Sequence, residues 1–287
     1  MKQRSTNLRQ AFAANPSRFV AAGAGHSATV SRPARELKLF ERVLAARRST
    51  DDATHPLAEK LRNLGLLGMA RTVSQLDLGS SESSFEQQLS LLIDNEITDR
   101  NNRQLARRLR YANLRFRASI AEVDYSAVRG FDDALFHLLS VGQWIADREN
   151  TIIEGPTGVG KTWLACALGE KACRDGRSVR YESVPGLVAD LVAVRGSNRH
   201  SYRMQNLAAV DLLILDDWGL QRFTADQRVE IFEILDRRCD RRSTLIASQH
   251  SVEKWPQIIG GSATSALLID RVIHNVHRLK LRGESLR

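Results

Sequence analysis

Residues 155–162 read Gly155-Pro156-Thr157-Gly158-Val159-Gly160-Lys161-Thr162. They have the form G-x-x-x-x-G-K-T, in which glycines without a Cβ let consecutive backbone N–H groups point into one anion-sized hollow. Lys161 is placed to reach the β and γ phosphates of a nucleotide, and Thr162 to offer its hydroxyl to Mg²⁺. The pattern therefore predicts a site for a nucleoside triphosphate and magnesium, formed by this whole stretch.

The neighbours of the loop favour that interpretation. A short β-branched run, Thr151-Ile152-Ile153, precedes it and predicts a strand. The apolar-faced segment from Trp163 to Cys173 follows and predicts a helix, with Gly176 as the residue that ends it. A phosphate-binding loop requires a strand before it and a helix after it, so the alternative of a glycine turn between unrelated elements is disfavoured.

A second site element begins at Leu212. The run Leu212-Leu213-Ile214-Leu215 indicates a strand buried on both faces, and Asp216-Asp217 follow at its carboxyl end. Carboxylates at that edge of a parallel sheet lie where ligands bind, which makes this a Walker B element. We expect Asp216 to hold Mg²⁺ through its water shell and Asp217 to orient or deprotonate the attacking water. The alternative is a strand that simply ends in an Asp-containing turn.

Strands and helices alternate through the second half of the chain. After the first strand and its helix come strands at 179–181, 212–215 and 244–249, with helices starting near residues 186 and 226 and then a last helix and strand. This alternation predicts an α/β fold, a P-loop three-layer αβα sandwich with a parallel sheet. We assign that domain to residues 126–287.

Residues 55–125 have a helical pattern instead. Two apolar stripes are separated by a break at 79–81, one with Leu57, Leu61 and Leu64 and the other with Phe85, Leu89, Leu92, Ile93 and Ile97. We expect a small N-terminal helical domain here.

Residues 1–54 contain no acidic residue before Glu36 and are rich in Ala, Ser, Gly and Arg. We expect a disordered basic extension, with one short amphipathic helix at 36–48. The same composition is typical of an organelle transit peptide, an alternative that we consider weaker.

The charge of the chain indicates a polyanionic partner. The formal net charge is +9 and the pI is near 9.9, an excess that one magnesium nucleotide does not need. Seven arginines fall within residues 100–117, and Arg100, Arg103, Arg107 and Arg110 recur at helical spacing. Such a stripe can neutralise successive DNA phosphates. A solvated helix face is the alternative, which we place second because few acidic residues accompany the arginines.

Other residues set limits on the class of protein. No apolar run approaches the ~18 residues of a membrane span, so we expect a soluble protein without a membrane partner. Cys166, Cys173 and Cys239 form no C-x-x-C pair and are expected to be small side chains in helices, in a reducing cytoplasm. None of the seven histidines has a metal-ligand spacing, so the only metal expected is the magnesium of the nucleotide.

Four stretches resemble one known family: GPTGVGKTWLACALGEKACRDG, DLLILDDWG, RRSTLIASQH and ALLIDRVIHNVHRLKLRGES. They are similar to the IstB-like ATP-binding proteins, the transposition helper ATPases of insertion sequences, which are relatives of the DnaC helicase loaders within the AAA+ class. The similarity extends over about residues 57–287. It implies an AAA+ core of the initiator type with sheet order 5-1-4-3-2 and an N-terminal helical domain for DNA contact and self-assembly.

The resemblance also implies a cofactor, partners and a location. These are ATP with Mg²⁺, double-stranded DNA, the transposase of the same element, and a homo-oligomer formed with ATP and DNA. The protein would be cytoplasmic and associated with the bacterial nucleoid.

Further residue roles are implied by the same resemblance. Ser248 and Gln249 close the fourth strand and resemble the sensor that touches the γ-phosphate or the attacking water, with Gln249 preferred. Arg271 resembles the arginine finger that reaches a neighbouring subunit's nucleotide. The alternative for Arg271 is a salt bridge on the helix surface with Asp270 or Glu253.

The Walker B element departs from the family pattern. Most AAA+ proteins end the Walker B strand with Asp-Glu, whereas this chain has Asp216-Asp217, whose second carboxylate is one methylene shorter. Hydrolysis is then expected to be slow unless a partner closes the site, although helicase loaders have the same pair. Arg282 resembles a second sensor, but this subfamily lacks a full C-terminal lid.

Three functions follow, in order of preference. The first is an ATP-dependent DNA-binding transposition helper that assembles on target duplex DNA and recruits or activates a transposase, with ATP hydrolysis driving release. The second is a DnaC-like replicative helicase loader, which would bind single strands and a helicase. The third is a P-loop kinase, which would need a lid and an acceptor site that the sequence does not show.

Overall fold

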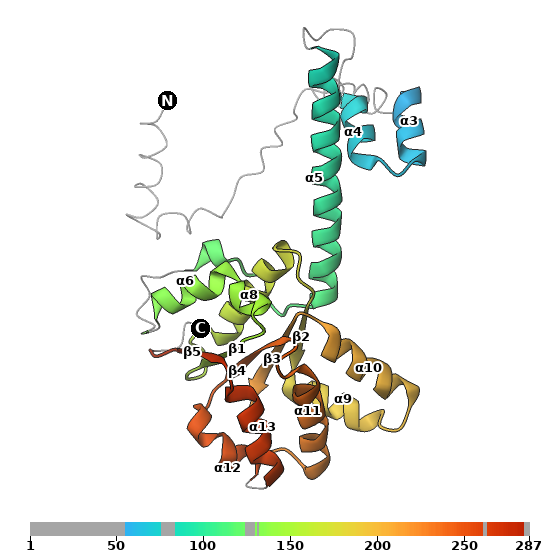
Figure 1. Cartoon of the computed structure of the whole chain (residues 1–287). Helices are drawn as coiled ribbons and strands as arrows, with labels where there is room; N and C mark the ends of the chain where they lie inside the picture. The colour runs from blue at the N-terminus through green and yellow to red at the C-terminus, as the bar shows by residue number, and fades with distance from the viewer. Residues whose placement is uncertain (1–54, 76–83, 124–129, 131, 261–262, 284–287) are drawn as a thin grey trace, which may run out of the picture.

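The computed structural model describes residues 55–75, 84–123, 130, 132–260 and 263–283. The helix expected at 36–48, the extension at 1–54 and the break at 79–81 lie outside these residues. Figure 1 shows an α/β part and a helical part, joined by one long helix.

The centre of the α/β part is a parallel sheet of five strands in the order β2-β3-β4-β1-β5. Read from the other edge, this is the expected order 5-1-4-3-2, so the fold prediction is confirmed. The strands are β1 (Asn150–Glu154), β2 (Val179–Ser183), β3 (Leu212–Trp218), β4 (Ser243–Ser248) and β5 (Val276–Lys280). Every residue of β4 and nearly every residue of β3 is buried, as expected for central strands covered on both faces.

Helices cover both faces of the sheet, which gives three layers. One face packs against α6 (Asp133–Val141), α7 (Gln143–Ala146) and α8 (Lys161–Arg174). The other packs against α9 (Val184–Ala193), α10 (Asn198–Ala209), α11 (Ala225–Arg238), α12 (Trp255–Ile259) and α13 (Ala263–Ile273). Two short 3-10 turns complete this description, η2 (Ile120–Glu122) and η3 (Val252–Lys254).

Cys166 and Cys173 are buried in α8, as expected, whereas Cys239 lies directly after α11. Among the helices within the described ranges, none combines the length and the hydrophobicity of a membrane span.

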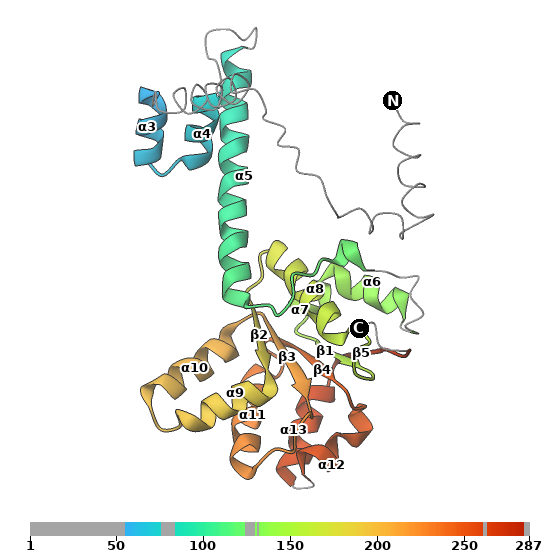
Figure 2. The ribbon, with the colours of Figure 1, turned by 180° about the vertical axis from the view of Figure 1, so that it is seen from behind.

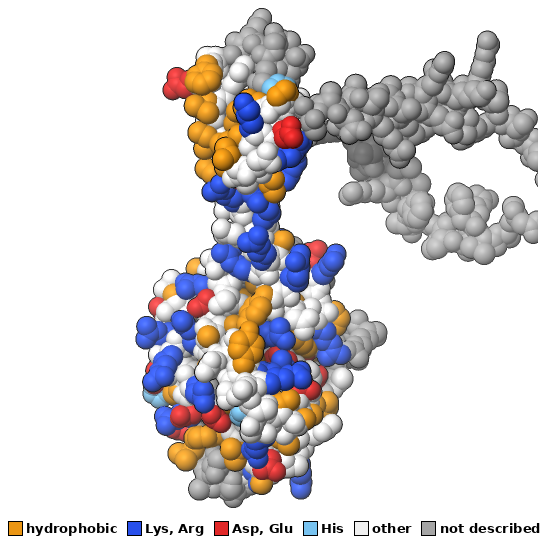
Figure 3. All heavy atoms as spheres, turned by 90° about the vertical axis from the view of Figure 1, so that its right-hand side faces the viewer, with side chains coloured by type: hydrophobic (Ala, Val, Ile, Leu, Met, Phe, Trp, Pro, Cys, Tyr) orange, Lys and Arg blue, Asp and Glu red, His pale blue; other side chains and the backbone are white. Residues whose placement is uncertain are grey.

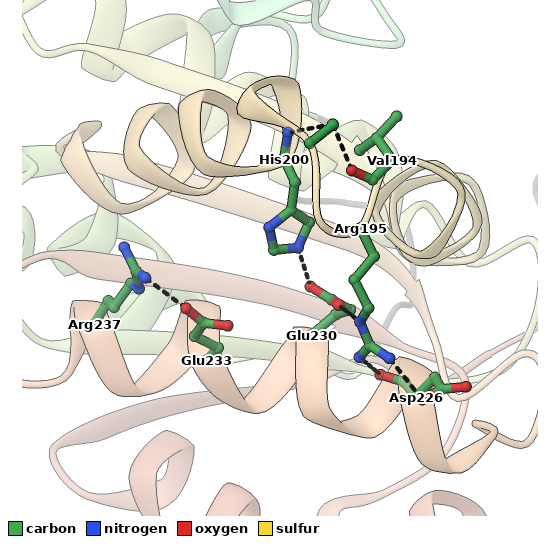
Figure 4. Close-up of polar contacts among 8 residues, drawn as sticks. Val194, Arg195, His200, Asp226, Glu230, Glu233 and Arg237 are labelled. Carbon is green, nitrogen blue, oxygen red and sulfur yellow. Dashed lines mark hydrogen bonds and ion pairs between the residues drawn. The ribbon is translucent and has the colours of Figure 1, made fainter.

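The turn between α9 and α10 is tied to α11 by a buried carboxylate (Figure 4). Glu230 of α11 is 1% exposed and accepts hydrogen bonds from Arg195 Nε and His200 Nε2, both at 2.7 Å. Arg195 Nη1 also lies 2.6 Å from Asp226 Oδ1. The buried charge of Glu230 is therefore paired with Arg195, and these contacts hold the α9–α10 turn against α11.

The helical part consists of α3 (Pro56–Asn63), α4 (Leu67–Gln75) and α5 (Phe85–Ala112). Ala58, Ala70 and Val73 form its small core. The long α5 starts with a capping box and reaches from this part to the sheet (Figures 1 and 2).

One carboxylate fixes α4 to α5. Buried Glu96 of α5 accepts hydrogen bonds from the backbone N–H groups of Gly68 and Met69, at 2.7 and 3.2 Å, and from Arg100 Nε at 2.7 Å. These bonds satisfy the free N–H groups at the start of α4.

The second apolar stripe predicted from the sequence lies on α5 but is largely uncovered. Phe85 is 79% exposed, Leu89 41%, Ile93 42% and Ile97 52%, while Leu92 packs against the small core. The periodicity located the helix correctly but did not decide which of its side chains are buried.

Candidate nucleotide-binding site

The phosphate-binding loop runs from the end of β1 to the start of α8. Gly158 and Gly160 have φ of +87° and +93°, a backbone conformation that favours glycine, and Lys161 is the first residue of α8. The free N–H groups at the N-terminus of α8 therefore face the loop, where an anion binds favourably.

Lys161 is held inside the loop. Its side chain is among the buried charged groups, and Nζ donates to the carbonyl oxygens of Gly155 and Pro156 at 2.8 and 2.7 Å. Burial lowers the pKa of Lys161, while the charges of Asp216 and Asp217 oppose that change. The ammonium group lies where added phosphate charge would stabilise it.

The two Walker B carboxylates, Asp216 and Asp217, lie in a bulge of β3. The β3–β4 register shifts between Leu215 and Trp218, and Asp217 has a φ of +58°. A bulge re-aims side chains, and a left-handed non-glycine residue is typical of a functional position. The result is that consecutive carboxylates both reach the carboxyl edge of the sheet.

Three side chains that the sequence had not singled out contact these carboxylates. The Tyr181 hydroxyl donates to Asp216 Oδ2 at 2.7 Å, and the Ser183 hydroxyl donates to Asp217 Oδ2 at 3.3 Å. Arg115 Nη1 donates to Asp217 Oδ2 at 3.4 Å and lies 3.9 Å from Asp216 Oδ2. Burial, together with the hydrogen bond to Asp216, raises the pKa of Tyr181 above its ordinary range, so this hydroxyl keeps its proton.

Ser248, the last residue of β4, and Gln249, which follows it, differ in position. Gln249 faces the loop, where its Oε1 accepts a hydrogen bond from the Thr157 hydroxyl at 3.0 Å. Ser248 is fully buried, and its hydroxyl bonds the carbonyl oxygens of Trp218 and His250 at 3.2 and 2.8 Å. Gln249 is therefore the one of the pair that is available to a ligand.

These groups line one cavity of about 670 Å³, which we call the nucleotide cavity. Its walls include Lys161, Thr162, Asp216, Asp217 and Gln249. Phe116, Glu122 and Trp163 add apolar and polar surface beside the loop.

The nucleotide cavity fits a nucleotide and its metal. The loop offers a buried ammonium group and a helix N-terminus to phosphates. Thr162 and Asp216 supply the oxygen donors that Mg²⁺ prefers. The cavity therefore has the residues needed to bind a magnesium nucleoside triphosphate.

Arg271 and Arg282 do not line this cavity. Arg271 is half-exposed on α13, and its Nε lies 3.3 Å from Asp236 Oδ1 of α11. The sequence suggested a salt bridge with Asp270 or Glu253, but among the described residues neither forms an ion pair with Arg271. Glu253 instead lies 2.7 Å from Arg278. Arg282 is exposed and lies beside Gly130.

The arginine stripe on α5 divides into two parts. Arg100 pairs with Glu96, and Arg103 lies 2.6 Å from Asp99 Oδ2, so this half of the stripe has acidic partners on its own helix. Arg107 and Arg110 are exposed, and no ion pair is recorded for them among the described residues. Figure 3 shows Lys and Arg side chains gathered on the narrow part of the molecule that α5 forms.

Comparisons with known proteins agree with the motifs. The family model described as IstB-like ATP binding protein matches residues 59–287. The chain is 49% identical over 235 residues to the insertion sequence ATP-binding protein y4pL of Sinorhizobium fredii, covering 81% of this chain and 96% of that protein. It is 41% identical over 198 residues to the ATP-binding protein of insertion sequence IS1162 from Pseudomonas fluorescens, covering 68% of this chain and 85% of that protein.

Two solved structures are similar at lower identity. DnaI is 20% identical with a TM-score of 0.49, covering 60% of this chain and 91% of that one. The replication initiator DnaA bound to AMPPCP and single-stranded DNA is 20% identical with a TM-score of 0.49, covering 60% of this chain and 52% of that one.

Proposed function

The chain belongs to the family of IstB-like ATP-binding proteins, and on that premise we propose that it is an ATPase that helps an insertion sequence to transpose. In this proposal it assembles as a homo-oligomer on target duplex DNA while ATP is bound. It recruits or activates the transposase of the same element, and hydrolysis drives release. The nucleotide cavity, with Lys161 on one side and the Walker B carboxylates on the other, is the observation that carries the proposal.

The chemistry needs few groups. With a nucleotide bound, Lys161 would leave the loop carbonyls for the β and γ phosphates, and Thr162 and Asp216 would hold Mg²⁺. The ion would neutralise charge on the phosphate oxygens. Asp217 accepts the proton of the attacking water, and Gln249 orients that water or the γ-phosphate.

Self-assembly has two supporting observations. Arg271 lies outside the nucleotide cavity of its own subunit and is half-exposed, which suits an arginine that acts on a neighbour's γ-phosphate. The uncovered row of Phe85, Leu89, Ile93 and Ile97 gives the helical part an apolar surface. We assign DNA contact and self-assembly to residues 55–125 and ATP hydrolysis to residues 126–287.

DNA contact is assigned to the stripe on α5. Arg107 and Arg110 are exposed and available to phosphates, whereas Arg100 and Arg103 would first have to leave Glu96 and Asp99. Contact through phosphates predicts binding that depends strongly on salt and little on DNA sequence.

The proposal is tested with Lys161→Ala and a matched control on the same helix, Lys171→Ala. Lys171 pairs with Asp175 away from the nucleotide cavity. The wild type and Lys171→Ala should bind ATP, hydrolyse it faster with duplex DNA, and form particles on duplex by electron microscopy with ATP but not with ADP. Lys161→Ala should lose all three properties. Unchanged ATP affinity in Lys161→Ala would remove the phosphate-loop assignment.

The DNA contact is tested with the double variant Arg107→Glu and Arg110→Glu. Its affinity should fall about equally for unrelated duplexes, and the slope of log affinity against log salt should flatten by roughly 0.9 for each lost contact. An unchanged slope would make the two arginines a solvated face. A loss confined to single-stranded DNA would favour the helicase loader.

A further inference from the structure

The C-terminal end of α5 is fastened beside the nucleotide cavity. Asn113, with a φ of +52°, ends the helix, and Arg180 Nη1 of β2 donates to the Tyr111 carbonyl oxygen at 3.1 Å. Ala112 is buried in the same core cluster as Ala165 and Cys166 of α8, and the Leu114 side chain packs against that cluster beside Gly169 of α8. The end of α5 and the segment after it therefore pack against the helix that begins with the phosphate-binding loop.

From this segment Arg115 reaches the Walker B carboxylates. Its guanidinium lies 3.4 Å from Asp217 Oδ2 and 3.9 Å from Asp216 Oδ2. The side chain is 48% exposed, and Arg115 is among the residues that line the nucleotide cavity. A hydrogen bond with the Tyr181 hydroxyl, which itself donates to Asp216, raises the pKa of Arg115. Lys161 binds loop carbonyls instead, so within the described residues Arg115 is the only cation in ion-pair contact with these carboxylates.

These contacts engage one oxygen of each carboxylate. Asp217 Oδ2 accepts from both Arg115 and Ser183, so its lone pairs are engaged, and the guanidinium charge lies beside the carboxylate as a whole. Asp216 Oδ2 accepts from Tyr181 and has the guanidinium charge nearby. A divalent cation approaching Asp216 meets a positive charge already in place.

We propose that Arg115 is a positioning residue of the ATP site, which holds Asp216 and Asp217 away from Mg²⁺ and from the attacking water until the end of α5 moves. This inference rests on the proposed ATPase function and adds its regulation. Arg115 acts through the two carboxylates, and its position is set by the helix that carries the arginine stripe.

The position of Arg115 links DNA contact to hydrolysis. Arg107 and Arg110 lie on the last two turns of α5, directly before the segment that holds Arg115. DNA phosphates that engage these arginines and shift the helix end withdraw the guanidinium from Asp217. By thermodynamic reciprocity, engagement of the carboxylates by bound magnesium nucleotide favours the same position of α5 and strengthens DNA binding.

The test compares Arg115→Ala with Arg115→Lys and with the control Arg117→Ala. Arg117 is exposed two residues further along, lies outside the nucleotide cavity, and has no recorded ion pair among the described residues. Calorimetry measures binding of a non-hydrolysable ATP analogue while Mg²⁺ is varied. The Mg²⁺ concentration for half-maximal tight binding should fall about two- to fivefold in Arg115→Ala, because a half-exposed ion pair no longer competes. It should fall less in Arg115→Lys, which keeps the charge, and should not change in Arg117→Ala.

Hydrolysis gives a second measurement. Without DNA, Arg115→Ala should hydrolyse ATP faster than the wild type, and added duplex should stimulate it less. A Mg²⁺ requirement equal to or above that of the wild type in Arg115→Ala overturns the proposal. If that variant does not fold, the requirement of Arg115→Lys decides in the same way. A wild type that binds but never hydrolyses ATP would refute the ATPase function, while the binding titration still decides the role of Arg115.

Discussion

Packing requires a glycine at position 155, where the phosphate-binding loop begins. We therefore predict that Gly155→Ala lowers both the stability of the protein and its affinity for nucleotide. A Cβ added to Gly155 would lie 2.5 Å from the backbone oxygen of Leu281 and 3.0 Å from its Cβ, whereas ordinary contact begins at 3.4 Å. Gly155→Ala must therefore move the loop or the chain after β5 by about 0.9 Å, because the obstacle is backbone. The φ of +156° adds strain for any residue with a side chain.

The expected cost follows from these contacts. Overpacking costs about 1–3 kcal/mol and the backbone strain about 1 kcal/mol more, so we expect a loss of about 3 kcal/mol in the free energy of unfolding. For a domain of this size the Tm should fall by roughly 6–12 °C. The Gly155 carbonyl also accepts a hydrogen bond from Lys161, so a displaced loop should weaken nucleotide binding about tenfold, equivalent to about 1.4 kcal/mol.

Thermal unfolding by circular dichroism and a nucleotide titration measure the two effects. The matched control is Gly186→Ala in α9, where an added Cβ meets nothing within 4 Å. Alanine in a helix is favoured over glycine by up to about 1 kcal/mol, so the control should unfold at the same or a higher temperature and bind nucleotide normally. If Gly155→Ala unfolded within about 2 °C of the wild type and bound nucleotide equally well, the packing argument would be wrong.

Three further predictions concern catalysis, assembly and pH. Asp217→Asn should bind ATP but hydrolyse it about a hundredfold more slowly, since an amide cannot take the proton of water; single-turnover phosphate release measures this, and a normal rate would place the base elsewhere. Arg271→Ala should bind ATP but lose DNA-stimulated turnover, with partial recovery when mixed with Asp217→Asn; no recovery at any ratio would favour a role within one subunit. Burial raises the pKa of Glu96, but hydrogen bonds from Arg100 and the start of α4 outweigh it, so the pKa lies below the ordinary 4.5. The stability that Glu96 provides should be present above pH 4.5 and lost as the pH falls through that lowered pKa, and acid unfolding of Glu96→Gln should show no such dependence.

The sequence was sufficient to predict the sheet and to predict that the candidate site residues lie together, because parallel strands bring their carboxyl ends to one edge. Lys161 follows β1, Asp216 and Asp217 end β3, and Gln249 follows β4. These strands are neighbours in the sheet, and the residues line one cavity. Local patterns of β-branched and apolar runs fixed the strands, and the sheet order brought the residues together.

Arg115 could not be placed in the same way. In the sequence it is one of several arginines near the end of a helical pattern, with nothing to separate it from Arg117. Its position depends on where α5 ends, at the left-handed Asn113, and on how the following segment packs on α8. The helix end has a local signal, because Asn is common at such ends, but the packing on α8 is a long-range result that single-sequence periodicity does not contain.

The acidic partners of the arginine stripe, in contrast, could be predicted from the local sequence. Glu96 and Asp99 lie four residues before Arg100 and Arg103, the spacing at which helical side chains meet. Residues 100–117 contain no acidic residue, so the charge partners of the stripe lie just before it in the sequence. The arginines of the stripe without an ion pair among the described residues, Arg107 and Arg110, therefore lie toward the C-terminal end of α5, nearer to the nucleotide cavity.

The location of Arg107 and Arg110 affects how bound DNA could move α5. The helix has 28 residues and is about 42 Å long. Glu96 binds its middle to α4, and Arg180 binds the Tyr111 carbonyl at its end. Arg107 and Arg110 lie between these two attachments, so a polyanion bound there acts on both. The polar attachment at the end is one 3.1 Å hydrogen bond from a partly exposed arginine, beside the apolar packing of Leu109 and Ala112 in the core, whereas Glu96 accepts several bonds in a buried position. Buried charge-assisted bonds are the more costly to break, so among the polar attachments the bond from Arg180 breaks more easily, and we propose that movement occurs at the end that carries Arg115.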